Sequence, residues 1–204
     1  VEQRVRAAGA LMICDEVQSG FGRMGQWWGH EFHGMEADLV TMGKPVGNGH
    51  PLGVIVTSAE ILERFTEKTG LFSTFGGNTV ACAAGNAVLD VIEREDLIEN
   101  GRVVGDYLRD GLRALADTQP LIGDVRGTGM LAGIEFVTDR EARTPATGET
   151  ARLLELLRQR HVLVGSEGRD ANILKLRPSL IFQREHADLL INALDDALGA
   201  LAAT

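Results

Sequence analysis

The sequence has little basic charge and no long apolar run. Its 20 lysines and arginines stand against 29 aspartates and glutamates, which gives a net charge of −9. This balance argues against a protein that grips nucleic acid through a basic stripe. A membrane-spanning helix needs about 18 or more consecutive apolar residues, and the chain has no such run. The opening residues carry neither the basic nor the apolar segment of a signal peptide, so we expect a cytoplasmic location.

Cysteine is scarce as well. Cys14 and Cys82 are the two cysteines among 204 residues, and each lies within an apolar run. Such usage is typical of buried thiols in a reducing compartment and not of a disulfide framework. With 44% apolar and 24% charged residues, the composition otherwise predicts a soluble globular protein with one large domain or two small ones.

Lysine is rare, whereas glycine is common. The three lysines are Lys44, Lys68 and Lys175, and 25 of the 204 residues are glycine. Glycine makes up about 12% of the chain, against an average near 7%, which indicates many tight turns and close approaches of the backbone. The first residue, Val1, is not a methionine, and a buried-looking strand follows soon after it. We therefore expect this chain to be an internal portion of a longer one.

Apolar periodicity predicts an α/β part followed by an α+β part. Short apolar runs predict strands, the first of them buried on both faces. A run rich in small residues predicts a helix that can approach its neighbours closely. A change of texture near Asp117 predicts a domain boundary, with residues 1–116 in one domain and 117–204 in the other. The predicted strands are 10–14, 38–42, 51–57, two around the glycine turn of 122–137, and 173–180; the predicted helices are 59–66, 79–94, 96–116, 147–160 and a closing helix that contains 187–201.

Two charged residues are predicted at the carboxyl ends of strands. Asp15 follows the first strand, and Lys44 follows the second, between Gly43 and Pro45. The ligand sites of open α/β sheets lie at such strand ends. One interpretation is an internal salt bridge, because buried aspartate and lysine are usually paired. The other is a cofactor site, because little side-chain bulk surrounds Lys44 and a lysine short of water can form a Schiff base with an aldehyde.

Three motifs give the chain a family resemblance. CDEVQSGFGRMG begins at Cys14, DLVTMGKPVGNGHPLG begins at Asp38, and FSTFGGN begins at Phe72. In this order they resemble the class III, fold-type I aminotransferases, which depend on pyridoxal 5'-phosphate. The resemblance extends over the whole chain but only over the later half of a family member. It implies the α/β class, with the later half of a fold-type I PLP-transferase large domain followed by a smaller α+β carboxyl-terminal domain.

The resemblance implies cofactor roles for four residues. Lys44 matches the lysine that holds the cofactor as a Schiff base. Asp15 matches the aspartate that pairs with the protonated pyridine nitrogen, where a fixed carboxylate lets the ring accept the electron pair of a broken Cα bond. Gln18 matches the residue near the cofactor's 3-oxygen. Thr74 matches the threonine that reaches the cofactor phosphate of the neighbouring subunit, which implies a homodimer.

A fifth residue is matched to the substrate. Arg177, in KLRPSL, matches the family arginine that binds the substrate α-carboxylate, a task for which the planar guanidinium is suited. A surface arginine before a proline is the alternative interpretation. The family commonly has a second proline at the position where this chain has Ser179.

Two histidines and a glutamate complete the candidates. His30 and His33 are spaced as metal ligands could be, but neither a cysteine nor a third histidine accompanies them, so we expect no metal site and a loop packed around Trp27 and Trp28. Glu16 either supports the cofactor-contacting residues from behind or takes part in a salt bridge, and the sequence leaves both interpretations open.

The resemblance implies ping-pong transfer of an amino group from an amine or amino acid to a 2-oxo acid or aldehyde. Lys44 would also carry the proton removed from the substrate Cα. The segments GNGHP and RTPATGETA look most like the subgroup of alanine-glyoxylate aminotransferase 2 and the ethanolamine-phosphate phospho-lyases. Elimination of phosphate from an amino-alcohol phosphate is therefore an alternative. A third hypothesis is a non-catalytic dimerisation module, if this fragment is the natural chain; a coding sequence about 200 residues longer upstream would count against it.

Overall fold

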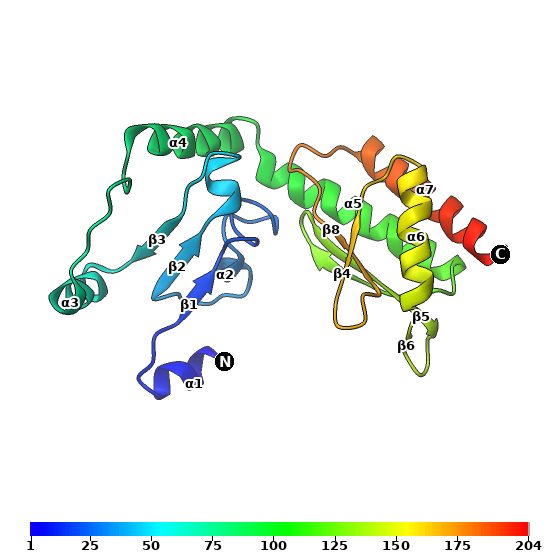
Figure 1. Ribbon diagram of the computed structural model, residues 1–204, viewed down its shortest axis with the longest axis horizontal. Coiled ribbons are helices and arrows are strands. Elements are labelled where there is room, and N and C mark those ends of the chain that lie inside the picture. Colours follow the sequence, from blue (N-terminus) through cyan, green and yellow to red (C-terminus); the bar gives the residue numbers. More distant parts are fainter. Residues whose placement is uncertain (204) are drawn as a thin grey trace. The chain divides into compact units, whose positions relative to one another are not determined.

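The chain forms two compact units (Figure 1). The computed structural model describes residues 1–203, and their contacts divide the chain into Val1–Ile98 and a second unit from Glu99 onward. This division falls near the start of helix α5 (Leu97–Thr118) because the helix packs into the core of the second unit. The domain boundary near Asp117 lies at the end of the same helix and stays a prediction. Of the helices in residues 1–203, none is long and apolar enough to cross a bilayer.

The first unit is built on a three-stranded sheet in the order β1-β2-β3. β1 (Ile13–Asp15) runs parallel to β2 (Leu39–Met42), and β3 (Val54–Thr57) is antiparallel to β2. The expectation that the first strand is buried on both faces is wrong. Cys14 is 7% exposed, but Ile13, on the opposite face, is 60% exposed.

Four helices and one 3-10 turn accompany this sheet in the described part of the first unit. They are α1 (Glu2–Ala7), α2 (Gly29–Phe32), the 3-10 turn η1 (Lys44–Gly47), α3 (Ala59–Thr69) and α4 (Thr79–Arg94). The Asn78 side chain accepts a hydrogen bond from the Ala81 N–H at 2.9 Å, so α4 begins at its predicted residue. Small residues let α4 approach η1 closely, since a Cβ on Gly85 would stand 3.7 Å from the backbone carbonyl oxygen of Val46. Cys82, expected to be buried, is exposed on α4, and both cysteines are free thiols.

The second unit is an antiparallel sheet in the order β4-β5-β8-β7, with β6 paired to β5. The predicted strand 173–180 ends at Leu176, because Pro178 lacks an N–H and restricts the residue before it. The bounds of the other elements are β4 (Ile122–Thr128), β5 (Leu131–Asp139), β6 (Thr144–Pro145), α6 (Thr147–Gln159), β7 (Gly165–Glu167), β8 (Ile173–Leu176) and α7 (Arg184–Ala202).

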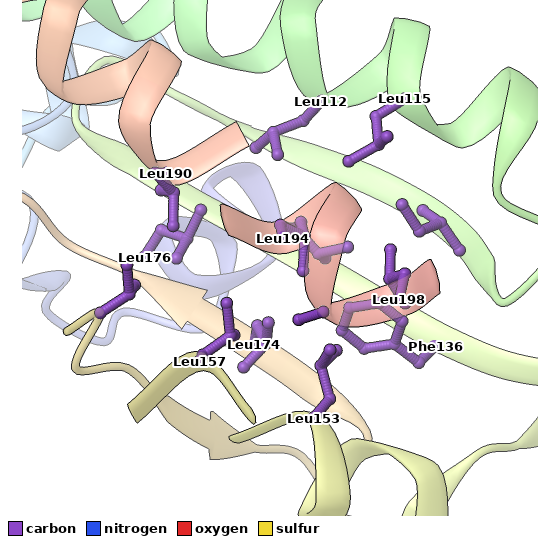
Figure 2. Packing of buried hydrophobic residues seen from close by; sticks show 14 of the residues in the cluster. Leu112, Leu115, Phe136, Leu153, Leu157, Leu174, Leu176, Leu190, Leu194 and Leu198 are labelled. Carbon is purple, nitrogen blue, oxygen red and sulfur yellow. The ribbon is translucent and has the colours of Figure 1, made fainter. Parts of the chain in front are cut away.

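Helices α5, α6 and α7 bury their apolar faces against one face of this sheet (Figure 2). Ile134 and Phe136 alternate with less buried residues along β5, and Leu174 of β8 lies directly across from Ile134. Such alternation is typical of an antiparallel sheet with one covered face. The apolar stripes predicted on residues 96–116 and on the closing helix contribute Leu108, Leu115, Leu190, Leu194 and Leu198 to this core.

Truncating the core should destabilise the second unit. Leu194 of α7 is fully buried, so Leu194→Ala removes apolar contacts and leaves a cavity, and we expect it to lower the free energy of unfolding by about 2–5 kcal/mol. Leu189→Ala, on the same helix but 58% exposed, is the matched control and should cost less than about 1 kcal/mol. Urea unfolding measures both, and equal losses would contradict the assignment of this core.

Candidate active site

Asp15 and Lys44 follow adjacent parallel strands at the same edge of the sheet. Asp15 is the last residue of β1 and lies beside Thr41 of β2, and Lys44 follows the end of β2. The turns after the two strands also meet, since a Cβ on Gly43 would stand 3.6 Å from Cγ2 of Val17. The sheet therefore brings the aspartate turn and the lysine turn together where α/β proteins bind their ligands.

Lys44 has an unusual backbone conformation. Its φ is +40°, in the left-handed region, and it is the first residue of η1. A non-glycine residue held in such a sparsely populated region costs on the order of 1–3 kcal/mol, and such residues cluster at active sites. Val46, only 4% exposed, anchors the turn just after Lys44, while the lysine itself is exposed. Lys44 is one of seven non-glycine residues with positive φ in residues 1–203, and it is the one of them that the sequence selected for chemistry.

The salt-bridge interpretation of this pair is wrong. Among the described residues of the first unit, Lys44 takes part in none of the ion pairs, which link Arg6 with Glu2 and Asp38, His30 with Glu16, and Arg94 with Glu95. Asp15 instead accepts a hydrogen bond from the Val17 N–H at 3.0 Å, which fixes the direction of its carboxylate. Both Asp15 and Lys44 are exposed, as groups that contact a ligand must be.

Gln18 and Thr74 lie on two different turns of the first unit. Gln18 is exposed in the turn after β1, which closes with the Gly20 N–H donating to the Glu16 carbonyl at 3.1 Å. Thr74 is exposed in the loop before α4, where the Gly76 N–H donates to the Ser73 hydroxyl at 2.9 Å. The structure therefore groups Gln18 with Asp15 and leaves Thr74 on a separate loop.

Arg177 belongs to the second unit. It directly follows β8, and its guanidinium lies 3.8 Å from the carboxylate of Glu167. Lys175 donates to the same carboxylate at 2.6 Å and holds the pKa of Glu167 below its ordinary value. The Arg177 side chain is 44% exposed and lines a mainly apolar pocket of about 530 Å³ with Phe182 and Leu190. An arginine beside an apolar pocket can hold the carboxylate of a ligand with an apolar body.

The sequence did not resolve the role of Glu16, the acidic residue after Asp15. Glu16 is 1% exposed, and its carboxylate accepts hydrogen bonds from Ser19, from the Gly29 N–H and from both the backbone and the ring of His30. His30, predicted to lie in a loop, is the second residue of α2 and pairs with this buried glutamate. The sequence signal for its burial is its spacing, because Glu16 follows the apolar Cys14 by two residues and successive side chains of a strand alternate between its faces.

The loop between Glu16 and α2 is packed as the sequence predicted, around tryptophan. The ring of Trp28 meets that of Phe21 edge to face with centroids 5.3 Å apart, and Trp27 lies 6.3 Å from Trp28. His33 packs against Phe32 instead of joining His30. Within residues 1–203, no group of three or more histidine, cysteine or acidic side chains could hold a metal ion.

The chain belongs to the class III aminotransferase family, because the family model described as "Aminotransferase class-III" matches residues 1–198. The enzymes of this family depend on pyridoxal 5'-phosphate, and the solved structures that resemble this chain are fold-type I enzymes of that kind. The predicted family, fold class and cofactor class are therefore confirmed.

Individual relatives carry two different activities in their names. The chain is 46% identical, over 97% of its length, to "Alanine--glyoxylate aminotransferase 2 homolog 2, mitochondrial" of Arabidopsis thaliana, of which it covers 41%. It superposes on an Arthrobacter phospholyase in complex with phosphoethanolamine with a TM-score of 0.94 and 46% identity. This match covers 98% of this chain and 47% of the phospholyase chain. A transaminase with L-alanine superposes with a TM-score of 0.91 and 31% identity, covering 100% of this chain and 49% of that one. The chain thus spans less than half the length of these relatives.

Proposed function

We propose that this chain forms part of a pyridoxal-phosphate-dependent transaminase that moves an amino group from an amine or amino acid to a 2-oxo acid or aldehyde. The observation that carries the proposal is the exposed, left-handed Lys44 beside Asp15 at the strand ends of a class III chain. The cofactor supplies an aldehyde that an amine can attack and a ring that accepts an electron pair.

The residues of the first unit fit this cofactor. Lys44 offers an exposed primary amine on a turn that buried Val46 holds in place. Asp15 would keep a proton on the pyridine nitrogen, because the Val17 N–H orients its carboxylate. Gln18 would contact the ring oxygen from the same turn. Once the substrate amine has displaced it, Lys44 would move the proton at the substrate Cα.

Substrate and subunit contacts come from other segments. Arg177 would bind the substrate carboxylate, for which its place at the rim of an apolar pocket is suited. Thr74 would reach the cofactor phosphate of a partner subunit in a homodimer. Its neighbours Phe72 and Phe75 are 89% and 78% exposed, and aromatic side chains left this open are typical of an interface.

The shared site predicts complementation between two inactive variants. In the full-length protein that carries this sequence, Lys44→Ala and Thr74→Ala homodimers should both be impaired. In a heterodimer of the two, one site carries both lesions and the other carries neither. A purified heterodimer should therefore recover about half of the wild-type activity, as measured by keto-acid formation. Recovery near zero, with the heterodimer confirmed by mass, would show that Lys44 and Thr74 serve a site within one chain.

A phospho-lyase is the second candidate function. The observation in its favour is the 46% identity to the phospholyase that holds phosphoethanolamine, against 31% to the transaminase with L-alanine. The same bond cleavage at Cα serves either reaction, because the electron pair can be reprotonated or can expel a leaving group. The plant relative named as an aminotransferase is equally similar, so sequence identity does not separate the two.

One assay separates these functions. The full-length protein is incubated with pyridoxal phosphate, a 2-oxo acid as amino acceptor and a panel of amines that includes phosphoethanolamine, and transfer of the amino group to the oxo acid is compared with phosphate release. Amino transfer without phosphate release supports the transaminase, whereas phosphate release from phosphoethanolamine supports the lyase. A folded protein that neither binds the cofactor nor turns over any amine would favour the non-catalytic module.

A further inference from the structure

Glu16 is a buried carboxylate whose two oxygens accept four hydrogen bonds. One oxygen, Oε1, accepts from the His30 backbone N–H at 2.8 Å and from the His30 ring nitrogen Nδ1 at 2.7 Å. The other, Oε2, accepts from the Ser19 hydroxyl at 2.5 Å and from the Gly29 N–H at 2.9 Å. A buried charge is stable only when paired and hydrogen-bonded in this way.

The chemistry of these contacts requires Glu16 to be ionised. Burial raises the pKa of this carboxyl, but the hydrogen bonds from Ser19, Gly29 and His30 together outweigh burial and leave the pKa below its ordinary value. Because an ionised carboxylate only accepts hydrogen bonds, the His30 ring must carry a proton on Nδ1. All four donors are thus oriented towards one charge.

The contacts close the loop between β1 and α2. Glu16 still belongs to the strand ladder, since its N–H donates to the Thr41 carbonyl at 2.8 Å. Its side chain joins this strand end to the turn that contains Ser19 and to the first residues of α2. Asp15 precedes Glu16 directly, and Gln18 lies in the turn that the Ser19 contact holds. One side chain therefore fixes the segment that carries both of these residues.

We propose that Glu16 is a positioning residue that holds Asp15 and Gln18 in the geometry needed to bind the cofactor ring. This inference rests on the proposed function. Glu16 acts through its neighbours, because its carboxylate lies on the buried side of β1, whereas Asp15 is exposed on the other side. Its buried contacts with two separate segments of the loop distinguish it from a surface salt-bridge partner.

The variant Glu16→Gln tests this role with little change of shape. An amide group in place of Oε1 would face the N–H of His30, and an amide group in place of Oε2 would face the N–H of Gly29. Either orientation sets the amide group against one backbone N–H that cannot accept a hydrogen bond, so the loop must shift. In the full-length protein we expect Glu16→Gln to raise the dissociation constant for pyridoxal phosphate about tenfold. Absorbance of the bound cofactor measures this constant.

A second background separates positioning from general destabilisation. In a protein that already carries Asp15→Ala and Gln18→Ala, Glu16→Gln should change the dissociation constant less than about twofold, because the side chains that it positions are gone. Its effect on the melting temperature should be the same in both backgrounds. An equal effect on cofactor binding in the two backgrounds, or none in either, would overturn the proposal.

Two further variants and the wild type make the test decisive. Ser19→Ala removes one donor to Glu16 and keeps its charge, and it replaces Glu16→Gln in the test if that variant does not fold. It should raise the dissociation constant for pyridoxal phosphate less than Glu16→Gln, with the same dependence on the background. Thr57→Val removes the 2.8 Å bond from the Thr57 hydroxyl to the Asp38 carbonyl in the same unit and should lower the melting temperature without affecting cofactor binding. A wild-type protein that binds no pyridoxal phosphate would refute the proposed function itself, whereas a wild type that binds it beside an unaffected Glu16→Gln would refute only the positioning role.

Discussion

Replacing Lys44 with alanine is expected to lower turnover by at least about a thousandfold, since one amine is asked both to hold the cofactor and to transfer the Cα proton. Among residues 1–203, Lys44 is the lysine that lies at this edge of the sheet. The other two lysines lie elsewhere: Lys68 is in the last turn of α3, and Lys175 is paired with Glu167 in the second unit. Lys68→Ala is the matched control and should leave turnover unchanged.

Borohydride reduction of the full-length protein with bound pyridoxal phosphate provides the direct measurement. Reduction makes the bond between lysine and cofactor permanent, and peptide mapping should then find the label on the peptide that contains Lys44. The label should be absent from Lys44→Ala. A label on Lys68 or Lys175 in the wild type would end the assignment.

Asp15→Asn is expected to keep the cofactor but to lower kcat about a hundredfold or more, as does the loss of other fixed groups that stabilise developing charge. A neutral amide cannot hold a proton on the pyridine nitrogen, so the ring accepts electrons less readily. The fold should survive, because the amide oxygen can still accept the hydrogen bond that the Val17 N–H now gives to Asp15. Steady-state kinetics and the absorbance of the bound cofactor measure the two effects separately.

The matched control for this change is Asp90→Asn, on the exposed surface of α4, which should leave both kcat and cofactor content unchanged. If Asp15→Asn is as active as the wild type, the carboxylate of Asp15 serves only to shape the turn after β1.

Most of the regular structure could be predicted from local sequence. Helix α4 begins and ends at its predicted residues because Asn78 caps it and its small residues favour a helix. The apolar stripe of α5 could be found because helical periodicity places Val104, Leu108 and Leu115 on one face, and all three are buried. The strand-end motifs likewise identified the family, because they reflect chemistry that requires particular residues at particular turns.

Short elements escaped prediction because they depend on distant partners. Strand β7 (Gly165–Glu167) has no apolar alternation and exists because its backbone pairs with β8. Similarly, α2 contains only four residues. Its first residue, Gly29, donates its N–H to the carboxylate of Glu16, which lies 13 residues earlier in the chain. Such contacts have no local signature, since hydrogen bonding between distant segments is set by the fold.

The sequence by itself determined the longer helices, most of the strands, the family and the residues selected for chemistry, because each follows from local periodicity or from a motif. Only the tertiary structure decided that Lys44 is strained and not paired with Asp15, that Cys82 and Ile13 are exposed, and that Glu16 closes the loop beneath the site. The physical reason is that exposure, pairing and backbone strain depend on which segments pack together, and residues far apart in the chain settle that jointly.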